Sequence, residues 1–473
     1  MKTLAEIREA GMEQAFHQIC RLLGGVSLDR MIQLTHLGEH LTHDPEIRRI
    51  VRGVRSYLEN ENHSARRLFA RVMEYLPREN QERLFRSLFL HGFFLGKKRR
   101  AEFAKTNGFE PPLLMILSPS WQCNLRCLGC YTLGYARDSK GLSRETVDRI
   151  LSECEEMGIF FVTILGGEPL VWPPLLDVIG AHPDVFFQVY TNGTLLTPEI
   201  ARRLRELGNV ALVFSIEGGE EQTDSWRGKG VYRKIMDAMD MAREARIIIG
   251  TSATVTSRNV DVVSSDEFLD FMISKGSLAQ MYFLYIPVNG RADFSLMVTP
   301  EQRDLLRRRV LRARNTKPIF VIDFWNDGPY VEGCIAGGRS YFHVNANGDV
   351  EPCVYTHIAV DNIHEKSLKE ALNSPLFRAI RARQPHNQNH LRPCMIIDNP
   401  HVMREIIAQV RPRFTHPGAE QIYTECKEQM DAYAARYAIL ADEVWQREYA
   451  ACRGAASDDP RGDELQRPVA SAG

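Results

Sequence analysis

Three cysteines within eight residues are the clearest candidates for chemistry in this sequence. The segment at 119–131 reads PSWQCNLRCLGCY, so Cys123, Cys127 and Cys130 follow a C-x3-C-x2-C spacing. Thiolates this close together on a loop can bind one iron–sulfur cube, and three cysteines for four irons leave one iron open to a substrate. A structural zinc site is the alternative, although such sites usually have four ligands arranged in pairs. The spacing therefore favours a catalytic [4Fe–4S] cluster over zinc.

The overall composition is that of an ordinary globular protein, with 473 residues, ten cysteines and a formal net charge of −1. Secreted disulfide scaffolds are smaller and richer in cysteine, so the clustered thiols are more typical of metal ligands, while Cys20, Cys154 and Cys452 are expected to be buried apolar side chains. The N-terminus lacks the apolar core of a signal peptide and no apolar run could span a bilayer, so we expect a cytoplasmic protein. The balanced charge gives no indication of a nucleic-acid partner.

The cysteine loop is expected to follow the first strand of an alternating series. Strand-like and helix-like segments alternate from residue 113 to about 325, with expected strands at 113–118, 160–165, 186–190, 210–216, 246–255, 281–286 and 319–324. Strict alternation predicts parallel strands joined by right-handed crossovers, either in an open sheet or in a closed or partial barrel. Both architectures carry their chemistry at the carboxyl ends of the strands.

Further motifs follow the next three strands of this series. They are Gly166-Gly167-Glu168-Pro169, Thr191-Asn192-Gly193-Thr194 and Ser215-Ile216-Glu217-Gly218. Glycines in such turns let the backbone approach a ligand closely. Each motif alone is only a turn, but the carboxyl ends of parallel strands meet at one edge of a sheet. We therefore expect all three beside the cysteine loop.

In this order, the motifs resemble those of the radical SAM superfamily. The resemblance implies a partial (β/α)6 barrel over residues 111–325, in which Cys123, Cys127 and Cys130 hold a [4Fe–4S] cluster that reductively cleaves S-adenosylmethionine to a 5′-deoxyadenosyl radical. It also implies an external reductant such as flavodoxin or ferredoxin. The residues that it assigns to cofactor binding are Gly166, Gly167, Glu168, Pro169, Asn192, Ser215 and Arg258. It identifies no catalytic side chain.

The sequence departs from the superfamily pattern at two positions. Gly129 precedes the third cysteine, where the superfamily often has an aromatic residue, and Glu217 replaces the commoner Asp after the fourth strand. The first departure is expected to weaken one packing contact with the adenine of the cofactor but to leave the cluster ligands unchanged. Asp224 and Arg227-Gly228 continue a superfamily pattern that we interpret as structural.

A second group of cysteines lies after residue 325. Cys334 is followed by thirteen residues, Gly348, four residues and Cys353, and Cys394 comes later. Asn347-Gly348 is typical of a hairpin turn between 341–344 and 350–351, which would bring the first two thiols together. The spacing resembles the opening of SPASM domains, which bind auxiliary [4Fe–4S] clusters. The resemblance implies one auxiliary cluster over residues 326–400, held by Cys334, Cys353 and Cys394, with Cys426 as a further candidate; a zinc site or unliganded thiols are the alternatives.

The flanking regions match no family that we can name. Residues 1–110 are expected to form a helical domain, and residues 401–473 further helices and a disordered tail. The segment at 84–100, LFRSLFLHGFFLGKKRR, ends in four cations and could form a membrane-surface helix. We favour instead a face of Phe85, Phe89 and Phe93 that packs inside the protein.

The substrate class follows only from the resemblance. Enzymes with SPASM domains most often modify peptides or proteins, so hydrogen abstraction from a peptide or protein is the leading expectation. The alternatives are the same chemistry on a lipid or small apolar metabolite, and a non-catalytic iron–sulfur electron carrier. A pure carrier would have no need of the turns that cradle a second cofactor.

Overall fold

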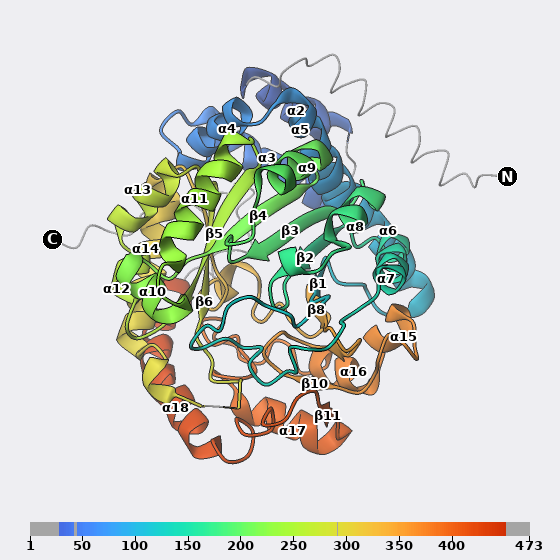
Figure 1. Ribbon diagram of the computed structural model, residues 1–473, viewed down its shortest axis with the longest axis vertical. Helices are drawn as coiled ribbons and strands as arrows, with labels where there is room; N and C mark the ends of the chain where they lie inside the picture. Colours follow the sequence, from blue (N-terminus) through green and yellow to red (C-terminus); the bar gives the residue numbers. More distant parts are fainter. Residues whose placement is uncertain (1–27, 42–44, 291, 451–473) are drawn as a thin grey trace.

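The computed structural model describes residues 28–41, 45–290 and 292–450, and a nine-stranded sheet forms its centre (Figure 1). Seven strands lie in chain order, each parallel to the next. They are β1 (Leu114–Leu117), β2 (Phe161–Ile164), β3 (Phe186–Thr191), β4 (Val210–Ser215), β5 (Ile248–Val255), β6 (Ala279–Leu284) and β7 (Phe320–Asp323). The predicted alternation is confirmed, and every expected strand is present to within two residues at each end.

Helices connect successive strands. In chain order they are α7 (Arg144–Met157), η2 (Pro169–Val171), α8 (Leu175–Ala181), α9 (Pro198–Leu207), α10 (Glu220–Arg227), α11 (Val231–Glu244), α12 (Val260–Val263), α13 (Asp266–Ser274), η3 (Phe294–Leu296) and α14 (Pro300–Thr316). Side-chain hydroxyls begin several of them, since Ser143, Thr197 and Ser265 each accept a bond from a backbone N–H in the first turn. Sequence signals of this kind locate helix starts well.

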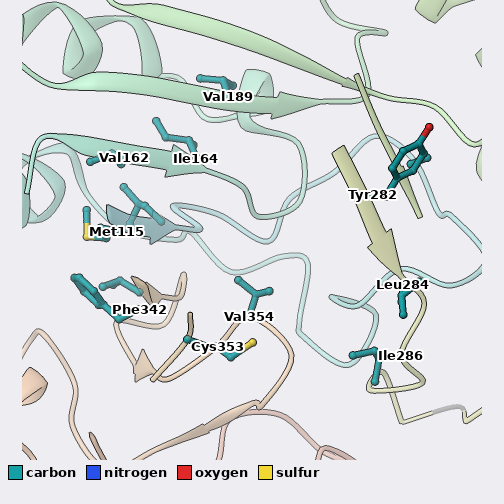
Figure 2. Close-up of a cluster of buried hydrophobic side chains, with 14 of the residues drawn as sticks. Met115, Val162, Ile164, Val189, Tyr282, Leu284, Ile286, Phe342, Cys353 and Val354 are labelled. Carbon is teal, nitrogen blue, oxygen red and sulfur yellow. The ribbon is translucent and has the colours of Figure 1, made fainter. Parts of the chain in front are cut away.

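The sheet continues past β1 into the second cysteine region. The predicted hairpin is present as β8 (Tyr341–Val344) and β9 (Val350–Glu351), which are antiparallel. On its free side β8 pairs in parallel with β1, so that Met115 lies opposite Phe342. Figure 2 shows the result, with Val162, Met115 and Phe342 in a row across neighbouring strands. No closed barrel forms among the described strands, as expected of a partial barrel, and the α/β architecture with a parallel sheet is confirmed.

The remaining C-terminal elements surround the hairpin. They are η4 (Gly328–Tyr330), β10 (Ile358–Ala359), α15 (Leu368–Leu372), α16 (Pro375–Arg381), α17 (Pro400–Val410), β11 (Arg413–Phe414), α18 (Lys427–Trp445) and η5 (Gln446–Ala450). Strands β10 and β11 form a separate antiparallel pair. None of the helices in the described ranges is both long and apolar enough to cross a membrane.

The N-terminal helices lie across the amino ends of the strands, seen in blue in Figure 1. They are α2 (Leu28–Leu41), α3 (Pro45–Glu59), α4 (Ser64–Tyr75), α5 (Arg78–Leu84), η1 (Phe85–Leu95) and α6 (Gly96–Asn107). Leu76 and Leu84 pack against Phe186 and Ala211, which are among the first residues of β3 and β4. This end of the sheet is therefore covered, and the carboxyl ends are left for a site.

Polar side chains of these N-terminal helices also donate hydrogen bonds to backbone carbonyls at or near the C-terminal ends of the helices that connect the strands. The last carbonyls of a helix have no partner within it and carry partial negative charge, which cations satisfy well. The bonds are Arg100 to Gly158 O (2.7 Å), Asn80 to Arg205 O (2.9 Å), Arg83 to Leu207 O (3.2 Å), Tyr75 to Ile247 O (2.6 Å), Arg71 to Ile273 O (3.1 Å) and Arg67 to Thr316 O (2.6 Å). Docking of the N-terminal helices is thus specified by contacts with the ends of α7, α9, α13 and α14 and with the residue before β5.

The expectation that Phe89 and Phe93 pack inside the protein is wrong. Phe89, Phe93 and Phe94 are 41%, 47% and 46% exposed. The physical reason is that η1 is a π-helix, whose bonds join residues five apart, so Leu90 and Leu95 face the core instead. The alternative of a membrane-surface helix is weakened as well, because two of the four cations at residues 97–100 make contacts within the protein. Arg99 donates a bond to Glu155 O, and Arg100 is buried.

Replacing Arg71 with Ala should loosen α4 from the barrel. Arg71 also bonds to Ser277 O and Pro318 O, so its loss leaves three carbonyls without their cationic donor. Bonds to charged groups contribute about 1.5–3 kcal/mol, so hydrogen–deuterium exchange over 64–75 should accelerate about 10- to 150-fold. Arg78→Ala is the control, because its exposed pair with Glu82 on the same helix is worth at most about 0.5 kcal/mol. Equal exchange in the two variants would contradict this role of Arg71.

Candidate functional site

The three clustered cysteines lie on the irregular segment between β1 and α7. Cys123, Cys127 and Cys130 are half-buried free thiols. The pKa of Cys127 is raised to about 12, mainly by burial; the nearby thiols of Cys123 and Cys130 contribute to this rise, and the Arg227 guanidinium opposes it. The three thiols are thus close enough to interact electrostatically. Their mutual repulsion as thiolates would have to be offset by a cationic group, as a metal cluster would do.

Asn124 ties the cysteine loop to the turn after β3. Its side-chain N–H₂ donates to Thr194 Oγ1 (2.7 Å), and its oxygen accepts a bond from the Asn192 side chain (2.9 Å). The Asn192 oxygen in turn accepts from the backbone N–H of Thr194 (3.0 Å). The expected site residue Asn192 is therefore brought directly against the cysteine loop.

Glu168 joins the turn after β2 to the turn after β3. Its carboxylate accepts bonds from Thr191 Oγ1 (2.6 Å), the Asn192 backbone N–H (2.8 Å) and the Leu170 backbone N–H (3.1 Å). Burial raises the pKa of Glu168, and these three donors oppose the rise. Because the Glu168 carboxylate accepts these three bonds, its side chain positions the turns after β2 and β3. A ligand could therefore contact the backbone of the turn after β2 rather than this side chain.

The glycines of this turn lie against the cysteine loop with no room for a side chain. A Cβ on Gly167 would come within 2.0 Å of Gln122 O, and one on Gly166 within 2.5 Å of Ser120 O. The backbone N–H of Gly167 donates to Ser120 O (2.9 Å) and that of Glu168 to Gln122 O (2.8 Å). The cysteine loop and the glycine turn are therefore joined by backbone bonds at a distance that only glycine allows.

A buried ion pair links the turn after β4 to Cys127. Arg227 donates to Glu217 (2.7 Å), and its Nη1 lies 3.8 Å from Cys127 Sγ. Burial lowers the pKa of Arg227, but Glu217 and the thiols raise it overall, so the guanidinium stays charged beside the cysteine loop. The longer Glu at position 217 makes this pair, which accounts for the second departure from the superfamily pattern. Asp224, interpreted as structural, accepts bonds from the N–H groups of Gly230 (2.6 Å) and Tyr232 (2.8 Å).

Ser215 and Arg258 also lie at the carboxyl ends of the strands, at the end of β4 and after β5 respectively. Ser215 ends β4 opposite Ser252 of β5 and is partly exposed. Arg258 is an exposed residue in the turn that follows β5. The structure thus gathers most of the expected cofactor residues into one hydrogen-bonded unit, with Arg258 at its margin.

The departure at Gly129 has a steric explanation. A Cβ at this position would lie 2.2 Å from the Trp226 ring and 2.8 Å from the Tyr285 ring. Trp226 and Tyr285 pack edge to face, with ring centroids 5.9 Å apart. Only glycine fits between this aromatic pair and the cysteine loop, and the pair fills the space where a side chain of residue 129 would stand.

The second cysteine set also comes together. Burial raises the pKa of Cys334, Cys353 and Cys394 to about 12, and each thiol raises that of another in the set. Cys353 follows the β8–β9 hairpin and accepts or donates a bond with Tyr341 Oη (3.0 Å). Cys426 interacts electrostatically with none of these thiols and lies toward the surface. Cys154 is buried against Met115, as expected of an isolated cysteine, and Cys20 and Cys452 lie outside the described residues.

A buried polar network connects the two cysteine regions. Ser118, at the end of β1, bonds to His343 (2.8 Å), which bonds to Glu351 (2.7 Å). Glu351 accepts a bond from Tyr135 of the cysteine loop (3.1 Å), and Tyr135 also bonds to His357 (2.8 Å). The hairpin that carries Cys353 is therefore fixed to the loop that carries Cys130.

Both cysteine sets supply the sulfur donors that an iron–sulfur cluster requires. Ligands of one ion converge on one point, and no three His, Cys, Asp or Glu side chains in the described ranges do so. Each cysteine on a cube binds a different iron, so its thiols stand further apart. The loop geometry, the sulfur donors and the glycine turn all suit that arrangement.

Sequence reasoning missed Asn124, Trp226 and the role of Arg227. Asn124 lies between two of the cysteines, so its position alone could have indicated a bridging role. Trp226 and Tyr285 gave no signal, because they contact Gly129 from 97 and 156 residues away in the sequence.

Comparison with known proteins agrees with this geometry. Residues 117–271 match the radical SAM superfamily and residues 334–395 match an iron–sulfur cluster-binding domain, SPASM. The chain is 28% identical over 302 residues to the AdoMet-dependent heme synthase of Methanosarcina barkeri, covering 57% of this chain and 85% of that protein. It is 29% identical over 303 residues to the mycofactocin maturase MftC of Mycolicibacterium smegmatis, covering 59% and 74%.

Solved structures show the same fold. Streptococcus suis SuiB bound to S-adenosylmethionine superimposes with a TM-score of 0.52 at 18% identity, covering 62% of this chain and 73% of SuiB. A radical SAM domain binds a [4Fe–4S] cluster and S-adenosylmethionine, and a SPASM domain binds auxiliary iron–sulfur clusters. Residues 117–271 are therefore a radical SAM domain, and residues 334–395 are a SPASM domain that follows it.

Proposed function

We propose that this enzyme cleaves S-adenosylmethionine reductively and uses the resulting radical to abstract hydrogen from a peptide or protein. One observation carries the proposal: the hydrogen-bonded unit that joins the cysteine loop to the turns after β2, β3 and β4. An iron–sulfur carrier would need the thiols, but it would not need a glycine turn held against them. A unit with both is suited to hold a second cofactor beside a cluster.

In this proposal Cys123, Cys127 and Cys130 hold the cluster, and the backbone of Gly166–Pro169 together with Asn192 and Ser215 holds the cofactor. When bound, the cluster supplies the electron that cleaves the sulfonium to methionine and the 5′-deoxyadenosyl radical. Arg227 holds positive charge beside Cys127 and offsets thiolate charge there. Arg258, exposed after β5, is free to pair with the cofactor carboxylate. The aromatic pair of Trp226 and Tyr285 offers a ring surface next to the loop.

The second site is proposed to bind one auxiliary cluster through Cys334, Cys353 and Cys394. Cys426 is excluded from the proposed ligand set because it does not interact with the other three thiols. Three protein ligands leave one iron open, which suits binding of a substrate group there. The network through Tyr135 and Glu351 keeps the two sites in a fixed relation.

A peptide or protein substrate is supported by a structural neighbour that has been solved with a peptide bound. SuiB has also been solved bound to its precursor peptide SuiA, and that structure superimposes with a TM-score of 0.51. The alternative is a small apolar metabolite, which the heme synthase relative favours. Partly exposed aromatic rings inside the barrel, Tyr190, Phe283 and Phe324, suit either an apolar metabolite or an apolar peptide side chain.

The catalytic ligands are tested by replacing Cys123, Cys127 and Cys130 together with Ala. After anaerobic reconstitution, iron content should fall by about four per chain and 5′-deoxyadenosine formation with dithionite should be lost. The matched control is Cys154→Ala, whose buried thiol is predicted to bind no metal and whose iron content should be unchanged. Deoxyadenosine produced by the triple variant would contradict the assignment.

The auxiliary site is tested in the background of that triple variant. Iron and labile sulfide should persist, and should then disappear when Cys334, Cys353 and Cys394 are also replaced by Ala. Cys426→Ala should leave the iron content unchanged, because its thiol lies apart from the set. Zinc without sulfide would point to a structural metal site, and no metal at all would leave these thiols as core residues.

The substrate class is tested by deuterium transfer. Hydrogen abstraction from a perdeuterated substrate places deuterium in 5′-deoxyadenosine, so a perdeuterated cell extract reports the substrate before it is identified. If the substrate is a peptide or protein, labelling should be lost when the extract is pretreated with protease and should stay in the aqueous phase after solvent extraction. Labelling that resists protease and moves into the organic phase would support the apolar metabolite instead.

A further inference from the structure

A fully buried ion pair lies beside the last cysteine of the second set. Arg303 of α14 donates from Nη1 to Asp398 Oδ1 (2.6 Å) and from Nη2 to Asp398 Oδ2 (3.2 Å), and neither side chain has exposed surface. Asp398 Oδ2 also accepts a bond from the backbone N–H of Cys394 (3.0 Å). The carboxylate therefore lies between the guanidinium and a cysteine of the proposed auxiliary site.

The segment that carries Cys394 folds around this ion pair. Arg303 Nη2 donates to Leu391 O (3.1 Å), three residues before the cysteine. After the cysteine, the backbone N–H groups of Asp398 (3.2 Å) and Asn399 (2.9 Å) donate to Cys394 O. Because the guanidinium binds the segment on both sides of Cys394, a side chain from α14 fixes where this cysteine lies.

Further elements enclose the guanidinium. Its Cζ lies 3.8 Å from the centre of the Tyr437 ring of α18, Nε donates to Asn326 Oδ1 (3.3 Å), and Nη2 also donates to Trp325 O (3.4 Å). Burial lowers the pKa of Arg303, but the Asp398 carboxylate raises it overall, so the guanidinium stays charged. The pair is thus held in one geometry with both charges present.

Stability alone explains this pair poorly. The free energy needed to remove two charges from water can exceed their attraction, and apolar residues of similar volume are often equally stabilising. Near an iron–sulfur cluster, however, charge and hydrogen bonds determine the reduction potential. Asp398 interacts electrostatically with the thiols of both Cys334 and Cys394. Its charge therefore acts on two of the three proposed ligands.

We propose that Arg303 and Asp398 position Cys394 and set the reduction potential of the auxiliary cluster through their opposite charges. The inference rests on the proposed function, which assigns one auxiliary cluster to the second cysteine set. The carboxylate next to Cys394 disfavours the more negative, reduced form of a cluster, and the guanidinium behind it offsets that effect. Arg303 acts through Asp398, so it is a positioning residue.

The test uses the full-length C123A/C127A/C130A protein, in which the auxiliary cluster alone contributes a signal. Its reduction potential is measured by a redox titration followed by electron paramagnetic resonance. Asp398→Asn removes the negative charge and should shift the potential upward, whereas Arg303→Met removes the positive charge and should shift it downward. Arg303→Lys keeps the charge and should keep the parent potential. A purely structural role predicts shifts of the same sign or none, and either result would overturn the proposal.

The matched control is a second ion pair one turn further along α14. Arg307 is 3% exposed and donates to Glu448 of η5 (2.6 Å) rather than to a cysteine segment. Arg307→Met and Glu448→Gln each remove one charge from a buried pair on the same helix. Both control variants should therefore leave the potential of the auxiliary cluster unchanged.

A double variant keeps the test decisive if a single variant does not fold. R303M/D398N leaves no charge buried alone, so it should fold, and it lacks the carboxylate nearest to Cys394. Its potential should lie above that of the R303K variant, and equal potentials would overturn the proposal. If the C123A/C127A/C130A protein itself carries no iron and no labile sulfide, the auxiliary site of the proposed function is refuted, and this inference with it.

Discussion

The buried carboxylate of Glu168 is the constraint on which the candidate site depends. A carboxylate removed from water must be satisfied by donors, and its three donors belong to the turns after β2 and β3. Glycine turns have little side-chain packing of their own, so this charge is what fixes their geometry. Through Asn192 and Asn124 the same constraint reaches the cysteine loop. These two turns and the loop therefore form one unit and would be disturbed together.

Different segments of the chain contact the amino ends of the strands and the β1 edge of the sheet. The N-terminal helices supply donors to the carboxyl ends of the barrel helices, which lie at the amino ends of the strands (Figure 1). On the opposite edge β8 extends the sheet next to β1, and Ser118 bonds to His343 at that junction. The proposed auxiliary site is thereby held next to the cysteine loop by both backbone and side-chain bonds.

Much of this arrangement could be predicted from the sequence because it depends on local patterns. Alternating strands, hydroxyl caps and the Asn347-Gly348 hairpin are encoded within short windows, and parallel strands bring their ends together. The pairing of β1 with β8 could not be predicted in this way, since it joins segments more than two hundred residues apart. The orientation of Phe89 was missed because a π-helix changes which residues share a face. The fit of Gly129 against Trp226 depends on shape, which no spacing rule contains.

Whether the cysteine loop and the strand-end turns form a single cofactor site is tested most directly by electron paramagnetic resonance. The measurement uses the C334A/C353A/C394A variant, reconstituted and reduced, so that only the cluster proposed at Cys123, Cys127 and Cys130 contributes a signal. With one iron open to the cofactor, adding S-adenosylmethionine should change the g-values of that signal. A spectrum that stays the same while S-adenosylmethionine is bound would contradict a shared site.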